Sequence, residues 1–234
     1  MTVLLVLFTL ILFLTCDHFV QRHRAHHAVG AHEQAERVPT FPFINFPHEV
    51  ALATNHTWLR NNPDGTTTIG VDEFLGRLIG VVEKISLPRT GEKVVPAVAG
   101  IGMQSRGRAL HITAPLAGQV VAANADVLKN PSLLVQDPYG RGWLMKVKSH
   151  VETASAVEDV LVSRPIEWLN QQVALLRDFL AMNSPQVQAV VLQEGGLPVE
   201  GVLQQFNADV WEKFGQSFAT LQKAKDADLQ EARS

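Results

Sequence analysis

The fold of this chain is decided by the stretch Asp137-Pro138-Tyr139-Gly140-Arg141-Gly142-Trp143-Leu144-Met145-Lys146-Val147-Lys148. Its first half is rich in proline and glycine, which predicts a tight turn, and its second half has the pattern of a strand. Upstream, Ala114-Pro115-Leu116-Ala117-Gly118 predicts a second turn that leads into a strand through Val121. Short apolar alternations of this kind, separated by turn residues, indicate a small β-rich domain over residues 48–149.

The same pattern continues toward the N-terminus of that domain. Asn62-Pro63-Asp64-Gly65 predicts a turn before the β-branched strand Thr66–Val71. Residues Asp72–Ile79 then predict a short helix with acidic residues in its first turn. A further strand begins at Val81–Ile85 and is closed by the turn Leu87–Gly91. The domain is therefore predicted to be mostly β, with short helices between strands.

Taken in order, these motifs resemble the H protein of the glycine cleavage system. The resemblance implies an α+β fold whose centre is a small β barrel-sandwich hybrid of the lipoyl/H-protein type, and it covers less than half of the chain. In the H family, a hairpin lysine carries lipoate in an amide bond. The resemblance rests on these segments: His56-Thr57-Trp58-Leu59-Arg60, Asp64-Gly65-Thr66, Ile69-Gly70-Val71, the Leu87-Pro88 and Gly91 turn, Ala114–Gly118, Asn124, Asn130-Pro131 and Asp137–Lys148.

The hairpin departs from the family pattern at its central residue. The resemblance places the lipoyl lysine seven residues before Ala114, and Gly107 occupies that position. No lysine occurs between Lys93 and Lys129. Arginine is no substitute, because its guanidinium stays protonated and is a poor nucleophile. We therefore expect no lipoate on this hairpin, and no cofactor at all.

Three roles remain open for Arg106-Gly107-Arg108. The arginines could simply solvate a hairpin tip at which glycine adopts a positive φ. They could pair with carboxylates of another protein or with anionic lipid headgroups, which makes Arg106 and Arg108 candidate partner contacts. Phosphate binding has less support, since no glycine-rich loop opens a helix here.

Composition excludes several classes of function. The chain has 234 residues and a net charge of −3, without the basic excess that favours nucleic-acid binding. Its single cysteine, Cys16, excludes an intrachain disulfide framework and a cysteine-based metal cage. Motifs for a nucleophile elbow, a phosphate loop or a zinc protease are missing. We expect a protein that is not an enzyme and takes no small-molecule substrate.

The N-terminal segment, residues 1–20, has the length and apolarity of one membrane-spanning helix. Basic residues follow it at Arg22 and Arg24, which predicts a single-pass protein of a bacterial-type inner membrane with its C-terminal domain in the cytoplasm. A cleaved signal peptide and a lipoprotein site at Cys16 are the alternatives. The residues predicted to anchor the helix in lipid are Leu4, Leu7, Phe8, Ile11 and Leu14.

Residues 21–47 are predicted to be a linker rich in histidine and proline. His23 and His27 have a spacing that suits a metal ion, but no carboxylate or cysteine stands at a matching position, so no metal site is predicted. Phe41 and Phe43 lie between prolines and are candidate contacts with the following domain or with a partner.

Residues 150–234 predict a helical extension. An apolar stripe after Pro165 predicts an amphipathic helix of about five turns, and a second long pattern runs from Pro198 to Leu221. The two helices could pair and fold back on the β domain, or keep surface for a partner, for which Trp168 and Trp211 are candidate contacts.

These features favour two functions. The first is a non-catalytic, membrane-anchored accessory subunit that supports a larger membrane complex of other protein subunits, such as a respiratory or photosynthetic electron-transfer assembly. The second is a membrane-tethered lipoyl carrier modified at an atypical lysine, such as Lys146 or Lys148.

Overall fold

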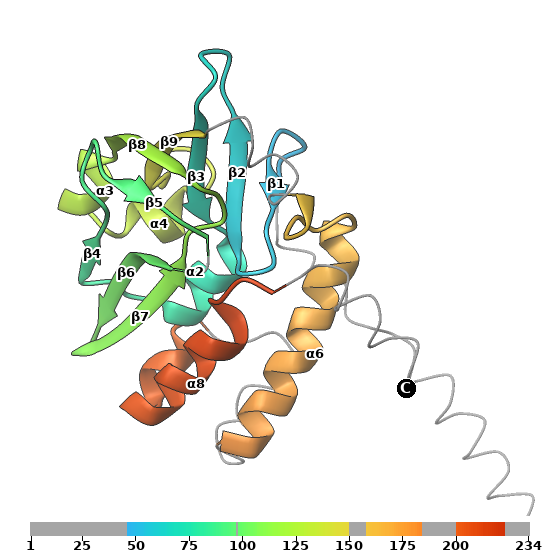
Figure 1. Cartoon of the computed structure of the whole chain (residues 1–234). Coiled ribbons are helices and arrows are strands. Elements are labelled where there is room, and N and C mark those ends of the chain that lie inside the picture. The colour runs from blue at the N-terminus through green and yellow to red at the C-terminus, as the bar shows by residue number, and fades with distance from the viewer. Residues whose placement is uncertain (1–45, 97, 150–157, 184–199, 223–234) are drawn as a thin grey trace, which may run out of the picture. The chain divides into compact units, whose positions relative to one another are not determined.

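The structure is a computed structural model that describes residues 46–96, 98–149, 158–183 and 200–222 (Figure 1). All of these residues belong to one unit of the chain, Phe41–Ser234. The predicted membrane helix at residues 1–20, the linker histidines, Phe41 and Phe43 lie outside the described residues. Within the described ranges, no helix has the length and apolarity needed to span a membrane.

Two antiparallel sheets form the β module. The larger sheet has the order β1-β2-β3-β9-β8-β5, and the smaller one has the order β4-β6-β7. The strands of the larger sheet are β1 (Ala51–Leu52), β2 (Thr57–Asn61), β3 (Thr67–Val71), β5 (Lys93–Val94), β8 (Gly118–Ala123) and β9 (Met145–Ser149). Those of the smaller sheet are β4 (Lys84–Ser86), β6 (Ala99–Ser105) and β7 (Arg108–Thr113).

The turn that begins at Asp137 forms because one carboxylate closes it. Asp137 accepts hydrogen bonds from the backbone N–H groups of Gly140, at 3.1 Å, and Arg141, at 2.8 Å. Gly142 must lack a side chain, because a Cβ there would lie 2.6 Å from the carbonyl oxygen of Leu133. The chain then enters β9, which pairs with β3 and β8. The stretch quoted first thus supplies the central strand of the larger sheet.

Three short helices connect the strands: α2 (Glu73–Ile79), α3 (Ala125–Lys129) and α4 (Leu133–Gln136). Asp72 caps α2 by accepting a hydrogen bond from the Leu75 N–H at 2.9 Å. Asn124 caps α3, and its amide also donates to the carbonyl oxygens of Arg141 and Trp143, at 2.8 and 2.6 Å. Asn124 therefore joins α3 to the Asp137 turn.

The centre of the module is Trp58 on β2, which is fully buried. Its indole Nε1 donates to the carbonyl oxygen of Val71 at 3.1 Å. The ring covers Gly70 on the neighbouring strand, where a Cβ would collide with it. A glycine at this position is needed for the tryptophan to lie flat on the sheet.

The helical extension contains α6 (Pro165–Asn183), the 3₁₀ helix η2 (Val202–Gln205) and α8 (Ala208–Phe218). The single long helix expected from Pro198 to Leu221 is therefore wrong. Asn207 starts a new helix by accepting a hydrogen bond from the Val210 N–H, at 3.0 Å, and η2 ends just before it. The side-chain cap competes with continuation of the helix through this point.

Helices α6 and α8 lie beside each other and against the β module (Figure 1). Phe179 of α6 makes edge contacts with Phe214 and Phe218 of α8, at ring-centroid distances of 5.8 and 5.9 Å. The two phenylalanines of α8 stack on each other at 4.6 Å. These aromatic side chains of the extension thus pack within the chain itself, whereas Ile166, Leu175 and Met182 of α6 are exposed.

This packing covers two predicted partner contacts. Trp168 is 6% exposed and Trp211 is 1% exposed. The Trp211 indole donates to the carbonyl oxygen of Leu203 at 2.7 Å, inside the extension. In this structure neither indole is available to a partner, because each completes the core of its own chain.

Backbone contacts join the extension to the β module. The Gly201 N–H donates to the carbonyl oxygen of Arg77 at 2.7 Å, where α2 ends. Thr113 of β7 donates its N–H to the carbonyl oxygen of Ala219 at 3.2 Å, and its hydroxyl oxygen accepts the Leu221 N–H at 3.1 Å. The extension and the module therefore share one continuous core.

Candidate functional site

The hairpin between β6 and β7 is the candidate site, because the family resemblance places the carrier lysine there. Its two-residue turn consists of Arg106, with φ +49°, and Gly107, with φ +73°. Ser105 and Arg108 form the last pair of the ladder. Two consecutive positive φ values are typical of a type I′ turn, which matches the twist of the strands. Arginine is unusual at the first of these positions, since a Cβ strains the left-handed conformation.

Space around Gly107 is open. A Cβ at this residue would meet no atom within 4 Å, so a side chain there would project into solvent. The position expected for a carrier lysine is therefore at the exposed tip, as a mobile arm would need. The tip has room for a lysine side chain, but neither Arg106 nor Gly107 provides an amine that could be acylated.

The two arginines of the turn have different surroundings. Arg106 is exposed. Arg108 is half-buried, and its guanidinium Nη1 donates to the carbonyl oxygen of Gln204 at 2.9 Å. Gln204 in turn donates its side-chain amide to the carbonyl oxygen of Ile79 at 2.9 Å. Arg108, predicted as a partner contact, instead connects the hairpin to η2 and through it to α2.

The lysines considered as alternative attachment points lie on β9. Lys148 is exposed, whereas Lys146 is half-buried and its Nζ lies 5.5 Å from the centre of the Trp143 ring. Lys146 pairs with Thr68 on β3, and Lys148 pairs with Gln119 on β8. Both lysines therefore stand within the larger sheet, on a strand that has neighbours on both sides, and not at a hairpin tip.

A buried histidine–aspartate pair of the module lies where the module meets the extension. His56 is fully buried, and its Nδ1 lies 2.7 Å from Oδ2 of Asp72, the residue that caps α2. The imidazole packs against Phe74 of α2 and Trp168 of α6, both at 4.7 Å between ring centroids. The backbone of His56 has φ +61°, which is strained for this residue. Sequence reasoning missed this pair, because no local spacing relates residues 56 and 72.

The described residues contain no group of three or more side chains suited to a metal ion. His23 and His27, whose spacing was considered for a metal, lie outside the described residues.

Comparison with known proteins gives the family. The family described as "Glycine cleavage H-protein" matches residues 50–168, half of the chain. The chain belongs to the glycine cleavage H-protein family. The match contains all nine strands and the hairpin, and it ends at Trp168, near the start of α6. Most of the helical extension therefore follows the H-family module.

Two curated H proteins and one solved structure are similar to this chain. The glycine cleavage system H protein of Idiomarina loihiensis is 34% identical over 123 residues, which are 53% of this H-family chain and 94% of the relative. The H protein of Neisseria meningitidis serogroup C is 36% identical over 104 residues, 44% of this chain and 81% of the relative. A crystal structure of the H protein of Mycobacterium marinum aligns with a TM-score of 0.42 and 26% identity, over 48% of this chain and 95% of that one.

Proposed function

We propose that this H-family chain is a non-catalytic binding module whose hairpin carries no lipoyl group. The observation that carries the proposal is Gly107 at the open tip of the hairpin, with no lysine between Lys93 and Lys129. Amide formation with lipoate needs an amine that can lose its proton, which the guanidinium groups of Arg106 and Arg108 do not offer.

The contacts of the hairpin support the same proposal. Arg108 is held by η2, and α8 packs against β7. A swinging arm works from a tip that is free to visit several partners. Behind the open tip at Gly107, this hairpin is fixed to the chain's own extension through Arg108 and β7, which suits a rigid binding module.

A carrier is the second candidate function, and membership of the H family favours it over an accessory subunit of a membrane complex. The relatives are named as H proteins of the glycine cleavage system, and the family resemblance implies lipoyl transfer. On this chain a lipoyl group would need a lysine away from the hairpin tip. Lys148 is the more accessible of the two lysines considered, since Lys146 packs on Trp143.

Intact-protein mass spectrometry separates the two functions. The full chain is purified from cells that also express a lipoate–protein ligase, and its mass is compared with that of the Lys146→Arg/Lys148→Arg double variant. The binding module predicts the unmodified mass for both proteins. The carrier predicts one lipoyl group on the natural chain. A lipoylated natural chain would disprove the proposal, and loss of the group in the double variant would locate it.

A Gly107→Lys variant provides the matched gain-of-function control. It places an amine where nothing lies within 4 Å, at the cost of strain from a positive φ. Acquisition of one lipoyl group by this variant, but not by Arg106→Lys or the natural chain, would show that the missing lysine alone separates this hairpin from a carrier.

The proposal includes a membrane tether and protein partners. The membrane tether is supported by the apolar sequence of residues 1–20 and by the basic residues that follow it. We expect the chain to sediment with the inner membrane, with its C-terminal domain in the cytoplasm, and to copurify with other membrane-protein subunits. Deletion of residues 1–20 should release it from the membrane fraction, and membrane retention of that deletion would contradict the tether.

A further inference from the structure

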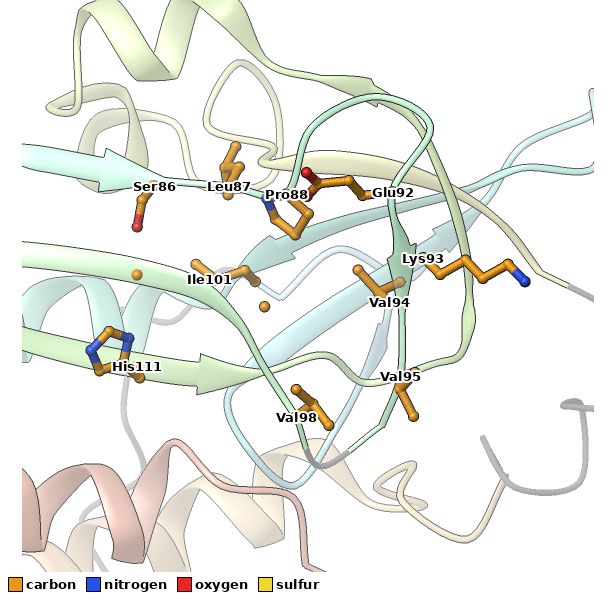
Figure 2. Close-up of a pocket in the computed structure, with 12 residues that line it drawn as sticks. Ser86, Leu87, Pro88, Glu92, Lys93, Val94, Val95, Val98, Ile101 and His111 are labelled. Carbon is orange, nitrogen blue, oxygen red and sulfur yellow. The ribbon is translucent and has the colours of Figure 1, made fainter.

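A cavity of about 360 Å³ opens beside the smaller sheet, away from the hairpin tip (Figure 2). It lies between the segment from Ser86 to Val95, Val98, and the strands β6 and β7. This volume is within the range of small-ligand pockets, which usually combine an apolar lining with a few polar groups.

Two glycines expose bare backbone to the cavity. Gly100 and Gly102 of β6 both line the cavity, and the ladder between β6 and β7 shifts register between Ala99 and Ile101, at Gly100. A Cβ on Gly100 would lie 3.4 Å from the Cβ of Ala114. A Cβ on Gly102 would collide with Oγ of Ser86 and would lie 3.7 Å from Nδ1 of His111. The absence of a side chain at Gly102 thus lets the Ser86 hydroxyl lie against the backbone of β6.

One end of the cavity is polar. Ser86, Gly102 and His111 are direct partners across β4, β6 and β7. Ser86 and His111 therefore flank Gly102 on its two sides. Figure 2 shows their side chains at the same end of the cavity. Both groups are able to donate a hydrogen bond to an anionic oxygen.

The remainder of the lining is largely aliphatic. Val94 and Val98 face the cavity across from Ile101 (Figure 2), and Val98 is 59% exposed. The one carboxylate in the lining, Glu92, accepts the Arg89 backbone N–H at 2.9 Å, and Figure 2 shows it away from the end of the cavity where Ser86 and His111 lie. The one ammonium group in the lining belongs to Lys93. An aliphatic ligand with an anionic head is thus better matched than one with a cationic head.

We propose that this cavity binds a short aliphatic carboxylate, with the carboxylate against Ser86 and His111 and the hydrocarbon chain along Val94 and Val98. The binding is non-covalent and does not depend on the hairpin, so the proposal is independent of whether the chain is a carrier. It departs from the sequence-based expectation that the chain takes no small molecule.

Titration of the detergent-solubilised, isotope-labelled full chain with hexanoate tests the proposal by NMR. We expect saturable shifts of the Ser86, Gly102 and His111 signals, with a Kd below about 1 mM. Hexylamine has the same chain with the opposite charge, and we expect no saturation with it. Absence of saturation with hexanoate, or equal binding of hexylamine, would overturn the proposal.

Three variants add matched comparisons. Val98→Glu places a carboxylate at the cavity and should weaken hexanoate binding by about tenfold or more. Val81→Glu adds the same charge at a residue that is 67% exposed and does not line the cavity, and it should leave the Kd unchanged. His111→Ala should weaken hexanoate by about fivefold to tenfold while leaving binding of neutral 1-hexanol unchanged. Equal losses in both valine variants, or equal losses of hexanoate and hexanol in His111→Ala, would contradict the assigned site.

Discussion

The H-family module and the helical extension bury their side chains by different means. The module relies on paired strands and on polar groups that are satisfied inside the protein, such as Asn55, whose amide donates to the Thr113 carbonyl oxygen at 2.8 Å. The extension relies on aromatic packing between α6 and α8. The two meet at His56, which is fully buried between Phe74 of the module and Trp168 of the extension.

The extension is therefore part of the same folded core as the module and not a separate appendage. Without Trp168 and Phe218, the His56–Asp72 pair would face water, and the apolar residues of β7 would lose the cover of α8. We therefore expect the module and the extension to unfold as one cooperative unit.

The largest effects on stability should come from removing one buried aromatic side chain from the module and one from the extension. Trp58→Ala in the module and Phe214→Ala in the extension should each lower the free energy of unfolding by about 3–5 kcal/mol, because both residues are fully buried. Urea denaturation followed by circular dichroism measures this. Val81→Ala, at an exposed residue, is the control and should change stability by less than about 0.5 kcal/mol. A Phe214→Ala protein that keeps the original main transition and gains a separate early one would show that the extension folds independently.

A smaller effect should come from the contact between Gly80 and Gly201. Gly80 ends α2 with φ +69°, and a Cβ there would lie 2.5 Å from the Cα of Gly201. Gly65 has φ +75° with no atom within 4 Å of its missing Cβ. Gly65→Ala should therefore cost about 1–2 kcal/mol through backbone strain alone.

Gly80→Ala should cost about 1–3 kcal/mol more than Gly65→Ala, because it also pushes the extension away from α2. Hydrogen exchange would localise the change: amides of η2 and α8 should lose protection in Gly80→Ala and keep it in Gly65→Ala. Equal stability of the two variants would mean that this junction adapts without loss.

The alkaline limit of stability offers a third test, and it reports on the module alone. Tyr139 is the only tyrosine of the chain, and burial together with the nearby charge of Asp72 raises its pKa. Because the pKa is raised in the folded state, Tyr139 makes its full contribution to stability at a pH below the ordinary pKa of about 10. This contribution is lost as the pH rises above that value. We expect tyrosinate absorbance to appear only when the protein unfolds, so that both signals share one midpoint.

Tyr139→Phe is the control for this titration. It keeps the ring contact with Phe46, at 5.9 Å, but removes the ionisable hydroxyl. The variant should unfold at a higher pH than the natural chain. Ionisation of Tyr139 near its ordinary pKa in a protein with an unchanged circular dichroism spectrum would contradict the described burial.

The smallest effect is expected at the exposed turn before β3. The Thr66 hydroxyl donates to Asp64 Oδ1 at 2.6 Å and lowers the pKa of that carboxyl. A lowered pKa stabilises the fold above the ordinary value of about 3.9, and this contribution is lost as the pH falls through the lowered value. Thr66→Ala should return the pKa of Asp64 toward its ordinary value, measured by NMR titration, with little change in stability because the group is exposed. Ser132→Ala is a distant control, and an unchanged Asp64 titration in Thr66→Ala would contradict the assigned cause.

Much of the module can be predicted from sequence because its signals are local. The turn at Asp137–Gly142 is built from residues that contact one another within a few positions, and its glycines and its aspartate are visible in the sequence. The position of the hairpin, the glycine at its tip and the missing lysine are likewise read directly from the order of residues. Local backbone preference and local hydrogen bonds are properties of a short segment, so they do not need the rest of the fold.

Only the tertiary structure decided which surfaces meet. Periodicity predicts an apolar stripe on a helix but does not say what covers it, so Trp168 and Trp211 looked available to a partner and are buried in their own chain. The bond from Arg108 to Gln204 spans 96 positions, and the pair of His56 with Asp72 joins two elements without any regular spacing. Such contacts depend on how whole elements pack, because burial is a property of the assembled core and not of a segment.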